Sequence, residues 1–423
     1  MPRSFMPRSF MNADWQQKLD SAIDARQQQM IAVRQHLHTH PELSGQEHET
    51  SLYLYQMLSD VGFNVRMGPD GRGLLVDSRD STQAPCIALR ADIDALPIHD
   101  EKNVTYRSQH DGVMHACGHD AHTAVVLGAL TALDDLRTQG DLPWPIRVRG
   151  LFQPSEETAT GAAEMVEAGA LEGVDAILAV HVDPSRSVGR IGIRTGILTA
   201  NCDAMRVSII GRGGHAARPH EAIDPIATAA QLISSLYLSI PRVTDSQDAV
   251  VVTIGRIVGG SNPNVIPEQV ELQGTLRTLD IDVRNRSMEH ISQICRGVAE
   301  SSGTQIHVAF ESGISSVNNH EPMADLLRQV GRDLLGAEQV EEIPRPSMGS
   351  EDFAVYLKYV SGALLRLGCV RPGMSGTPLH NPSFDLDESA IVIGSKLLAQ
   401  AAVTWSNPDR HSADSCPVVE QSR

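Results

Sequence analysis

Short apolar runs alternate with helical segments over residues 73–180, and this alternation restricts the fold more than any other feature. Strands are expected at residues 73–76, 86–91, 146–152 and 176–180, with helices between them at residues 121–136 and 161–170. Strands that alternate with helices predict an α/β layer, in which a mostly parallel sheet is flanked by helices.

Acidic and imidazole side chains follow the ends of these expected strands. Asp92 and Asp94 follow the second strand, Glu156 and Glu157 follow the third, and His181 ends the fourth. In open α/β sheets the ligand crevice lies outside the carboxyl ends of the strands. We therefore expect these acids and this imidazole to meet at one crevice.

A second pattern interrupts the first. Strands and helices in the order β-α-β-β-α-β predict an inserted ferredoxin-like α+β domain; the strands are expected at residues 204–210, 250–257, 269–277 and 305–310, and the helices at 225–240 and 283–301. The α/β pattern then returns with a helix near 321–335, a strand near 363–368 and a helix over 387–404 introduced by Asp387. The N-terminal part is helical over residues 15–34 and 47–61.

These patterns divide the chain into two domains. We expect residues 12–198 and 313–405 to form one discontinuous domain, which carries these acids and this imidazole, and residues 199–312 to form the inserted domain. The ends, residues 1–11 and 406–423, are polar and aperiodic and are expected to be disordered. The repeated MPRSF at the start is interpreted as a duplicated start without structural content.

Composition excludes some partners. With 423 residues and 41% hydrophobic content, the chain is long enough for two cores. Its 35 Lys and Arg against 52 Asp and Glu give a net charge of −17, which disfavours nucleic acid and anionic membranes. No stretch has the length of a membrane span or the apolar core of a signal peptide. Six scattered cysteines predict reduced thiols and a cytoplasmic protein.

The stretch HACGHDAH, residues 115–122, holds three imidazoles, a thiol and a carboxylate. Cysteine sulfur and histidine nitrogen are ligands for zinc and its first-row neighbours, and the glycine lets Cys117 and His119 turn toward one point. The alternative is a helix start that happens to carry histidines. Among the remaining residues, Asp120 is expected to be the N-cap of the following helix, and His115 and His122 to have supporting roles.

The adjacent carboxylates Glu156 and Glu157 are the second strong signal. Burying both is costly unless a cation or a shared proton compensates. A useful division gives Glu157 to a metal and leaves Glu156 to take a proton from activated water. The alternative is an exposed acidic turn.

Two histidines come from other segments. His181 ends an apolar strand, where a lone histidine is more often structural, and His380 lies between prolines in a loop that is suited to hold an imidazole. With Cys117, His119 and Glu157 they make five donors, enough for two metals that share a bridging group. Whether Cys117 or His119 bridges stays open. Asp94 is favoured as the carboxylate that orients a metal-bound imidazole.

Other polar clusters are weaker signals. His36, His38 and His40 alternate before Pro41, where a surface helix end is as good an explanation as metal binding. Glycines around His215 and Asn264 permit tight turns, which alone would explain them. Arg277 is suited to form a bidentate pair with a substrate carboxylate.

The motifs RADIDALP, HACGHDAHTA, LFQPSEE, AVHVDP, GRGGHAARPH, NVIPE, GTLRTLD, MGSEDFA and LHNPSFDLDE follow one another in order over residues 90–388. In this order and spacing the chain, over about residues 30–402, closely resembles the metal-dependent aminoacylase and carboxypeptidase family. The most similar branch is that of the amidohydrolases, which includes hippurate hydrolases and hydrolases of indoleacetyl-amino acid conjugates.

The resemblance implies a two-metal hydrolase of N-acyl-amino acids. Its metal ligands match Cys117, His119, Glu157, His181 and His380. Glu156 matches the general base, and Asp94 matches the carboxylate that orients a ligand. His215 matches a histidine that stabilises the oxyanion in the neighbouring protomer's site, which implies a homodimer or higher oligomer formed through a lid and dimerisation domain. Asn264 and Arg277 match residues that hold the substrate, whereas His36, His38 and His40 match a motif outside the metal site.

Three functions compete. The first is an amidohydrolase of N-acyl-amino acids with two divalent ions, of zinc, manganese, cobalt or nickel. The second is a dipeptidase or carboxypeptidase with the same metals, and the third is a protein that binds metal or amino acids without catalysis. The intact Glu156–Glu157 pair speaks against the third. One departure is the segment 201–205, where relatives often carry an aromatic residue, so a wide aromatic acyl pocket is not implied.

Overall fold

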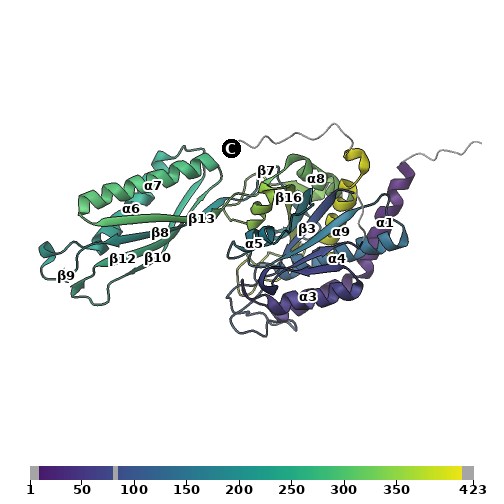
Figure 1. Ribbon diagram of the computed structural model, residues 1–423, viewed down its shortest axis with the longest axis horizontal. Helices are drawn as coiled ribbons and strands as arrows, with labels where there is room; N and C mark the ends of the chain where they lie inside the picture. Colours follow the sequence, from purple (N-terminus) through teal and green to yellow (C-terminus); the bar gives the residue numbers. More distant parts are fainter. Residues whose placement is uncertain (1–8, 80–83, 412–423) are drawn as a thin grey trace, which may run out of the picture. The chain divides into compact units, whose positions relative to one another are not determined.

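The chain folds into two compact units in a computed structural model that describes residues 9–79 and 84–411 (Figure 1). Residues 197–318 and 345–354 form the second unit, and the remaining described residues form the first. The sequence-based division instead gave all of 313–405 to the discontinuous first domain. The segment 345–354 groups with the second unit because its backbone bonds to the start of that unit: Ser347 N donates to Leu198 O, and Ala200 N donates to Gly349 O, both at 2.9 Å.

The first unit is built on an eight-stranded sheet in the order β1-β2-β4-β3-β5-β16-β6-β15. Its central strands β4, β3, β5 and β16 are parallel, which confirms the prediction of a mostly parallel α/β sheet. The strands are β1 (Asn64–Met67), β2 (Leu74–Asp77), β3 (Cys86–Asp92), β4 (Arg147–Gln153), β5 (Ala176–Ser187), β6 (Ile191–Ile193), β15 (Val340–Glu342) and β16 (Ser361–Val370).

Helices flank this sheet. They are α1 (Ser9–Ala25), α2 (Gln27–Thr39), α3 (His48–Val61), α4 (His119–Gln139), α5 (Gly161–Glu167), α8 (Glu321–Leu335) and α9 (Ser389–Trp405). The expected helix over 15–34 is in fact two helices, because the chain turns at Arg26, whose amide donates to Ile23 O. Asp387 precedes α9 as expected and accepts from Ser389 N at 3.0 Å, although the N-cap position itself is Glu388.

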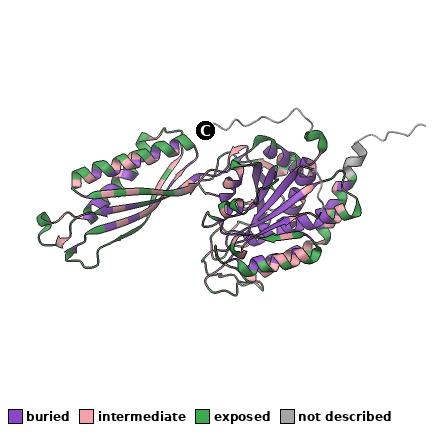
Figure 2. Cartoon of the chain, viewed as in Figure 1, coloured by how far each residue is buried: buried purple, intermediate pink, exposed green. Residues whose placement is uncertain are grey.

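One apolar core holds the sheet and helices of the first unit together (Figure 2). Helix α4 packs on β3, β4 and β5, and it also packs against α1, α2 and α9. Strand β3 is buried along its whole length, as expected for a central strand with both faces covered. Burial of this kind fixes the strand ends, and these ends position the candidate site.

The second unit has the predicted ferredoxin-like order. Its antiparallel sheet runs β10-β12-β8-β13, which places the first strand of the motif between the third and the fourth. The elements are β8 (Asn201–Ile210), α6 (Pro225–Val243), β10 (Val250–Gly259), β12 (Gln269–Thr278), α7 (Ile281–Ser302) and β13 (Gln305–Ile314). Two short sheets pair β9 (Gly214–His215) with β11 (Val265–Ile266), and β7 (Gly196–Ile197) with β14 (Asn318–Asn319).

The chain ends are more ordered than expected where the structure describes them. Helix α1 already includes residues 9–11, and residues 406–411 contain a 3-10 turn at Pro408–Arg410 that Asn407 caps. Residues 1–8 and 412–423, with most of the MPRSF repeat, lie outside the described residues. None of the described helices has the length and apolar character needed to cross a membrane.

Candidate metal centre

The carboxyl ends of β3 and β4 and the middle of β5 bring the predicted donors together. His181 does not end its strand as expected, because β5 continues to Ser187. Since the three strands are parallel neighbours, His181 still lies level with the end of β3, near Asp94 and Glu157. Cys117 and His119 come from the start of α4, and His380 comes from the loop before α9. The ligand atoms fall into overlapping groups whose members lie within 4.8 Å of one another.

Two of these groups share Cys117. We call Cys117, His119 and His181 the buried donor group, because all three side chains are buried. We call Cys117, Glu157 and His380 the open donor group, because the His380 side chain is 52% exposed. The structure thus brings all five predicted ligands into two adjacent sets with one common thiol.

Each imidazole of the buried donor group is held at one nitrogen. His181 Nδ1 donates to Val182 O at 2.8 Å, which leaves Nε2 3.6 Å from Cys117 Sγ. His119 Nδ1 lies 3.0 Å from Asp94 O and 3.1 Å from Asp94 Oδ1. A bond at Nδ1 fixes the tautomer and presents the lone pair of Nε2 to the group.

His119 Nε2 is buried and has no hydrogen-bond partner among the described residues, and Glu157 Oε1, 3.9 Å from it, is buried with only the ion-pair contact to His380 Nε2 at 3.3 Å. A buried polar atom without a partner costs about 1–3 kcal/mol, so a native site rarely keeps one without a ligand. A thiol, imidazoles and a carboxylate are together the donors of zinc-like divalent ions. The residues present therefore fit a divalent metal.

The electrostatics of the site favour a cation. Burial lowers the pKa of His119, but Asp92, Cys117 and Asp94 together raise it well above its usual value. Burial raises the pKa of Asp92, yet His119, His122 and Arg90 hold it well below its usual range. Burial raises the pKa of the Cys117 thiol, and Glu157 and Glu156 add to this against the opposing effect of His119. A bound cation reverses such an effect because it stabilises the thiolate.

The general-base candidate Glu156 lies beside the buried donor group. It is 9% exposed, and its Oε2 lies 3.9 Å from His119 Nε2. The turn before it is unusual, because Ser155 adopts φ 55° without being glycine. Glu47 holds this turn: its Oε1 accepts from Ser155 N at 2.7 Å. A strained backbone that its surroundings hold in place is a common feature of functional sites.

His380 is held in a similar way. Its φ is 61°, and its backbone N donates to Ala116 O at 2.8 Å, which fixes the loop to the segment that carries Cys117. Its Nε2 lies 3.3 Å from Glu157 Oε1. The interaction with Glu157 raises the pKa of His380.

Asp94 lies where the sequence placed it, behind the ligands. Its Oδ2 accepts from Ser44 Oγ at 2.7 Å and from Glu157 N at 3.0 Å, while Oδ1 lies 3.1 Å from His119 Nδ1. Burial raises the pKa of Asp94, but the bond to His119 and the other donors lower it overall. One carboxylate therefore orients both an imidazole and the Glu157 backbone.

Asp120 is not the N-cap that the sequence analysis expected. The N-cap position of α4 is Gly118, whose φ of 88° and contact with Val182, 2.5 Å from an added Cβ, leave no room for another residue. Asp120 thus falls inside the first turn, fully buried. It pairs with Arg34 Nε at 2.9 Å and with His38 Nδ1 at 2.7 Å.

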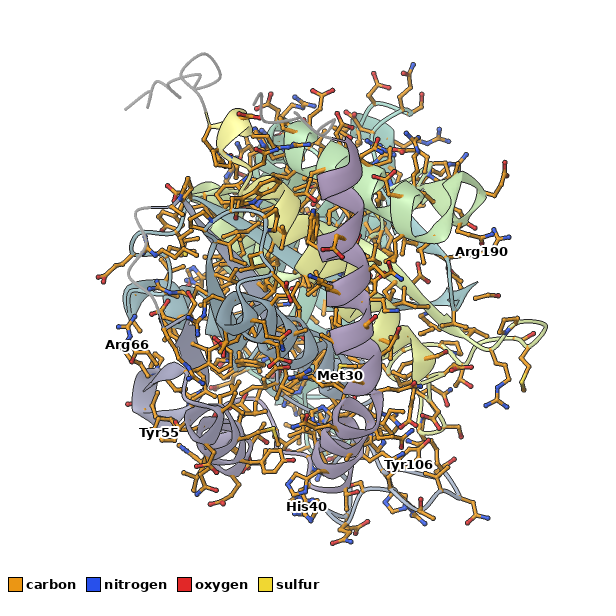
Figure 3. The ribbon with its side chains drawn as sticks, turned by 90° about the vertical axis from the view of Figure 1, so that its right-hand side faces the viewer. Met30, His40, Tyr55, Arg66, Tyr106 and Arg190 are labelled. Carbon is orange, nitrogen blue, oxygen red and sulfur yellow. The ribbon has the colours of Figure 1, made fainter. Side chains whose placement is uncertain are left out.

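Arg34 is a residue that the sequence analysis missed. It is fully buried, and besides Asp120 it pairs with Asp385 at 2.8 Å and Glu388 at 3.1 Å. Its guanidinium also lies 4.6 Å from the ring centre of Tyr106, which is labelled in Figure 3. It therefore ties the first turn of α4 to the loop that follows His380. The signal was a charged residue on the apolar face of α2, among Met30, Val33 and Leu37.

The supporting roles of His122 and His115 differ from each other. His122 Nδ1 lies 2.6 Å from Asp92 Oδ1, and its Nε2 accepts from Val182 N at 2.9 Å, so it anchors the part of β5 that carries His181. His115 has no hydrogen-bond partner for either nitrogen among the described residues, and burial lowers its pKa to about 4.

The alternate histidines lie outside the donor groups. His36 stacks on Tyr53 with ring centres 4.0 Å apart, and His40 Nδ1 bonds to His36 O. His38 is buried, not on the surface, and contacts Lys102 Nζ at 2.9 Å.

The three remaining predicted site residues belong to the second unit. His215 and Asn264 are exposed and line one surface depression around the β9–β11 pair. His215 Nδ1 accepts from Ala217 N at 3.1 Å, and Asn264 O accepts from Ala216 N at 3.0 Å. Arg277 lies on β12 and donates to Met348 O at 2.8 Å.

The fold and the donor groups together define a two-unit α/β metallohydrolase. Residues 88–404 match the model of peptidase family M20/M25/M40, and the chain belongs to this family. It is therefore a hydrolase, and the predicted family is confirmed.

Individual relatives agree with this assignment. An N-acetyl-L-cysteine deacetylase of Bacillus subtilis is 38% identical over 381 residues, 90% of this chain and 89% of the relative. An N-acyl-L-amino acid amidohydrolase of Geobacillus stearothermophilus is 37% identical over 306 residues, 72% of this chain and 82% of the relative. A solved structure from Bacillus subtilis, a dinuclear metal-binding peptidase of the M20 family, has a TM-score of 0.76 and 35% identity, covering 90% of this chain and 98% of that one.

Proposed function

We propose that this protein hydrolyses the amide bond of N-acyl-amino acids at a centre of two divalent metals. The observation that carries the proposal is the pair of donor groups that share Cys117, with Glu156 beside them. Support comes from the relatives, which are a deacetylase and an amidohydrolase of acyl-amino acids and a dinuclear metal-binding peptidase. The buried donor group would hold one ion, and Glu157 and His380 with Cys117 would hold the other.

Bound divalent ions would supply polarisation of the scissile carbonyl and a lowered pKa of water. Glu156 would act as the base that takes a proton from the attacking water and gives it to the leaving amine. Its turn is fixed by Glu47, so the carboxylate is in position before substrate arrives. Asp94 keeps the His119 imidazole oriented, and His122 anchors the part of β5 that carries His181.

The second unit supplies the remaining proposed roles. His215 stabilises the oxyanion, Asn264 holds the substrate carbonyl, and Arg277 binds its carboxylate. The exposure of His215 and Asn264 in one depression is consistent with contact to a ligand. A donor to a developing oxyanion is typically worth about 3–4 kcal/mol.

The proposed dimer forms through the second unit. Strand β10 is an edge strand, and several large apolar side chains on it and on α6 are exposed: Tyr237, Leu238, Val251, Ile257 and Val258. An exposed edge strand with apolar side chains is suited to pair with a second copy of the chain. Sedimentation of the wild type and of Ile257→Lys tests this, and a wild type that is monomeric yet fully active would refute a role of His215 in the neighbouring protomer.

The test of catalysis replaces Glu156 by Gln. Because Glu156 is a base and not a member of the two donor groups, the variant should keep its metal content while turnover of N-acetyl-amino acids falls by about 10²- to 10⁴-fold. Glu167→Gln, an exposed change on α5, is the matched control. Retained activity in the Glu156 variant would contradict the assignment of the base.

A dipeptidase or carboxypeptidase is the second candidate, because the related solved structure is that of a peptidase. A panel of acetyl-, benzoyl- and indoleacetyl-amino acids beside dipeptides separates the two, and a preference for dipeptides would reverse their order. Stoichiometric metal without hydrolysis of either class would favour the non-catalytic alternative.

The nature of the ions is also a proposal. The thiolate favours zinc, cobalt or nickel, while the carboxylate also admits manganese. Elemental analysis of the purified protein, followed by reconstitution with each ion, identifies the native one. A cytoplasmic location stays a prediction, supported by the five described cysteines, which are all free thiols.

A further inference from the structure

Arg366 lies directly beside a proposed metal ligand. Strands β16 and β5 are parallel neighbours, and their register pairs Arg366 with His181. Side chains of paired residues on adjacent strands extend from the same face of a sheet, and those of the next residues extend from the other face. The flanking residues Leu365 and Leu367 are accordingly buried in the core of the first unit. The guanidinium therefore shares a face with the imidazole of the buried donor group.

No hydrogen bond or ion pair joins the Arg366 side chain to any residue that the structure describes, although Arg366 is partly buried. The other arginines of the first unit's interior are all engaged. Arg34 pairs with three carboxylates, Arg149 pairs with Asp77, and Arg90 pairs with Asp92. Charged side chains are seldom withdrawn from water without a partner, because the lost hydration is not replaced.

The surroundings of Arg366 supply no free anion. On its other side, β6 places Gly192 in register with it, and the Arg186 guanidinium lies over that glycine, so the neighbouring side chain is a second cation. The nearest carboxylates along the strands, Asp183 and Glu341, are already paired with Arg186. An unpaired guanidinium on the same face as a metal ligand has the geometry of a carboxylate receptor, because its planar fork binds a carboxylate through two hydrogen bonds.

We propose that Arg366 binds a second carboxylate of the substrate, so that the preferred substrates are acyl-amino acids with two carboxylates. This inference rests on the proposed function, in which Arg277 takes the first carboxylate. The second carboxylate belongs either to the side chain of the amino acid, as in an acyl-glutamate, or to the acyl group, as in a succinyl-amino acid. Both place the same chemical group near the centre.

Matched substrate pairs test the inference. N-acetyl-glutamate is compared with N-acetyl-glutamine, and N-succinyl-leucine with the succinamide in which the acyl carboxylate is an amide. The ratio of kcat/KM between the charged and the neutral member is measured for wild type, Arg366→Met, Arg366→Lys and the control Arg371→Met. Arg371 is an exposed arginine that follows the same strand and lies 3.6 Å from Asp387.

In at least one pair the wild type should prefer the charged substrate. Arg366→Met should lower the ratio of kcat/KM between the charged and the neutral member by about 10- to 100-fold, the usual effect of a lost hydrogen bond to a charged group. Arg366→Lys should restore part of this ratio, and Arg371→Met should leave the ratio unchanged. The pair that responds identifies the source of the carboxylate. Ratios that are equal in wild type and Arg366→Met for both pairs would overturn the inference, even if overall activity falls.

A binding measurement separates this inference from the proposed function. Calorimetry compares glutarate with its monoamide on the metal-loaded wild type and on Arg366→Met. Tighter binding of glutarate that the Met variant loses supports the carboxylate site even if no acyl-amino acid is hydrolysed, in which case only the proposed function fails. Equal binding of glutarate to both proteins, with hydrolysis intact, would overturn the site alone.

Discussion

The two donor groups differ in how their side chains are held. In the buried donor group His119 comes from a helix start and His181 from the middle of a strand, and each ring is held at Nδ1. In the open donor group His380 comes from a loop, is 52% exposed, and adopts a positive φ that one backbone bond to Ala116 helps to maintain. Cys117 is the one residue common to both.

This difference has a physical consequence. Ligands on regular elements with locked rings need little reorganisation to bind an ion, whereas a strained loop has to be kept in place by its surroundings. We expect the buried donor group to bind its ion more tightly and the open donor group to release its ion first. Removing metal stepwise with a chelator should therefore pass through a state with one ion per chain.

The largest effect should come from Cys117→Ala, because this change removes a donor from both groups. Loss of a residue that hydrogen-bonds a metal ligand already lowers metal affinity by about 10- to 100-fold. Loss of the ligand Cys117 itself should lower the affinity for both ions by more than this. Metal content after gel filtration should fall below one ion per chain, and turnover should be lost. Cys86→Ala, which alters another buried thiol, is the control. Two retained ions would exclude Cys117 as the shared ligand.

His380→Ala should affect only one of the groups. The buried donor group keeps all its members, so the variant should hold about one ion per chain and lose the second by more than about 100-fold in affinity. With cobalt as a probe, the thiolate absorption of the remaining site should persist. His320→Ala, an exposed histidine before α8, is the control. Loss of both ions together would show that the two groups do not act as separate sites.

Asp94→Asn should weaken the buried donor group without removing a ligand. In the carboxylate one oxygen accepts from Ser44 and the Glu157 backbone, and the other accepts from His119. An amide has only one oxygen, and its NH2 group is a donor, so one of these two sides loses its acceptor. We expect metal affinity to fall by about 10- to 100-fold. Competition with a coloured chelator measures this. Asp77→Asn, which alters an ion pair with Arg149, should leave the affinity as in the wild type.

The site residues that follow an apolar run in the sequence could be predicted. Glu157 and His181 follow apolar runs that are recognisable as strands, and parallel strands bring their carboxyl ends to one edge. The inserted domain was recognisable because its strands and helices follow one another in the ferredoxin-like order. For His380 the flanking prolines indicated only a loop suited to hold an imidazole, and the resemblance to a family matched this residue to a metal ligand.

The parts that could not be predicted depend on contacts between distant segments. Arg34 bonds to Asp120 and Asp385, which are 86 and 351 residues away, and no periodicity shows that these side chains meet. Asp120 was expected to be a cap because acids often start helices, but the tight packing of Gly118 on Val182 moved the cap position. The segment 345–354 groups with the second unit through backbone hydrogen bonds, which the types of residue in the segment do not reveal.

The smallest effect on the donor groups should come from His115→Leu. This variant tests the buried interior behind the buried donor group. His115 is 1% exposed, and neither ring nitrogen has a partner among the described residues. Burial lowers its pKa from 6.5 to about 4. Replacing it by an apolar side chain removes no hydrogen bond and should leave metal content unchanged.

The pH dependence of stability is where this variant should differ. Between pH 6.5 and 4 the unfolded chain binds a proton at His115 and the folded chain does not, so the free energy of unfolding falls as the pH falls through this range. The contribution of this histidine is about 3 kcal/mol over the whole range. Urea unfolding of metal-free wild type at several pH values should therefore show a steeper loss than His115→Leu, whereas His99→Leu, an exposed change, should follow the wild type. Parallel curves for wild type and His115→Leu would mean that His115 gains a proton in the folded state, and the interior behind the buried donor group would then be more accessible to water than its burial indicates.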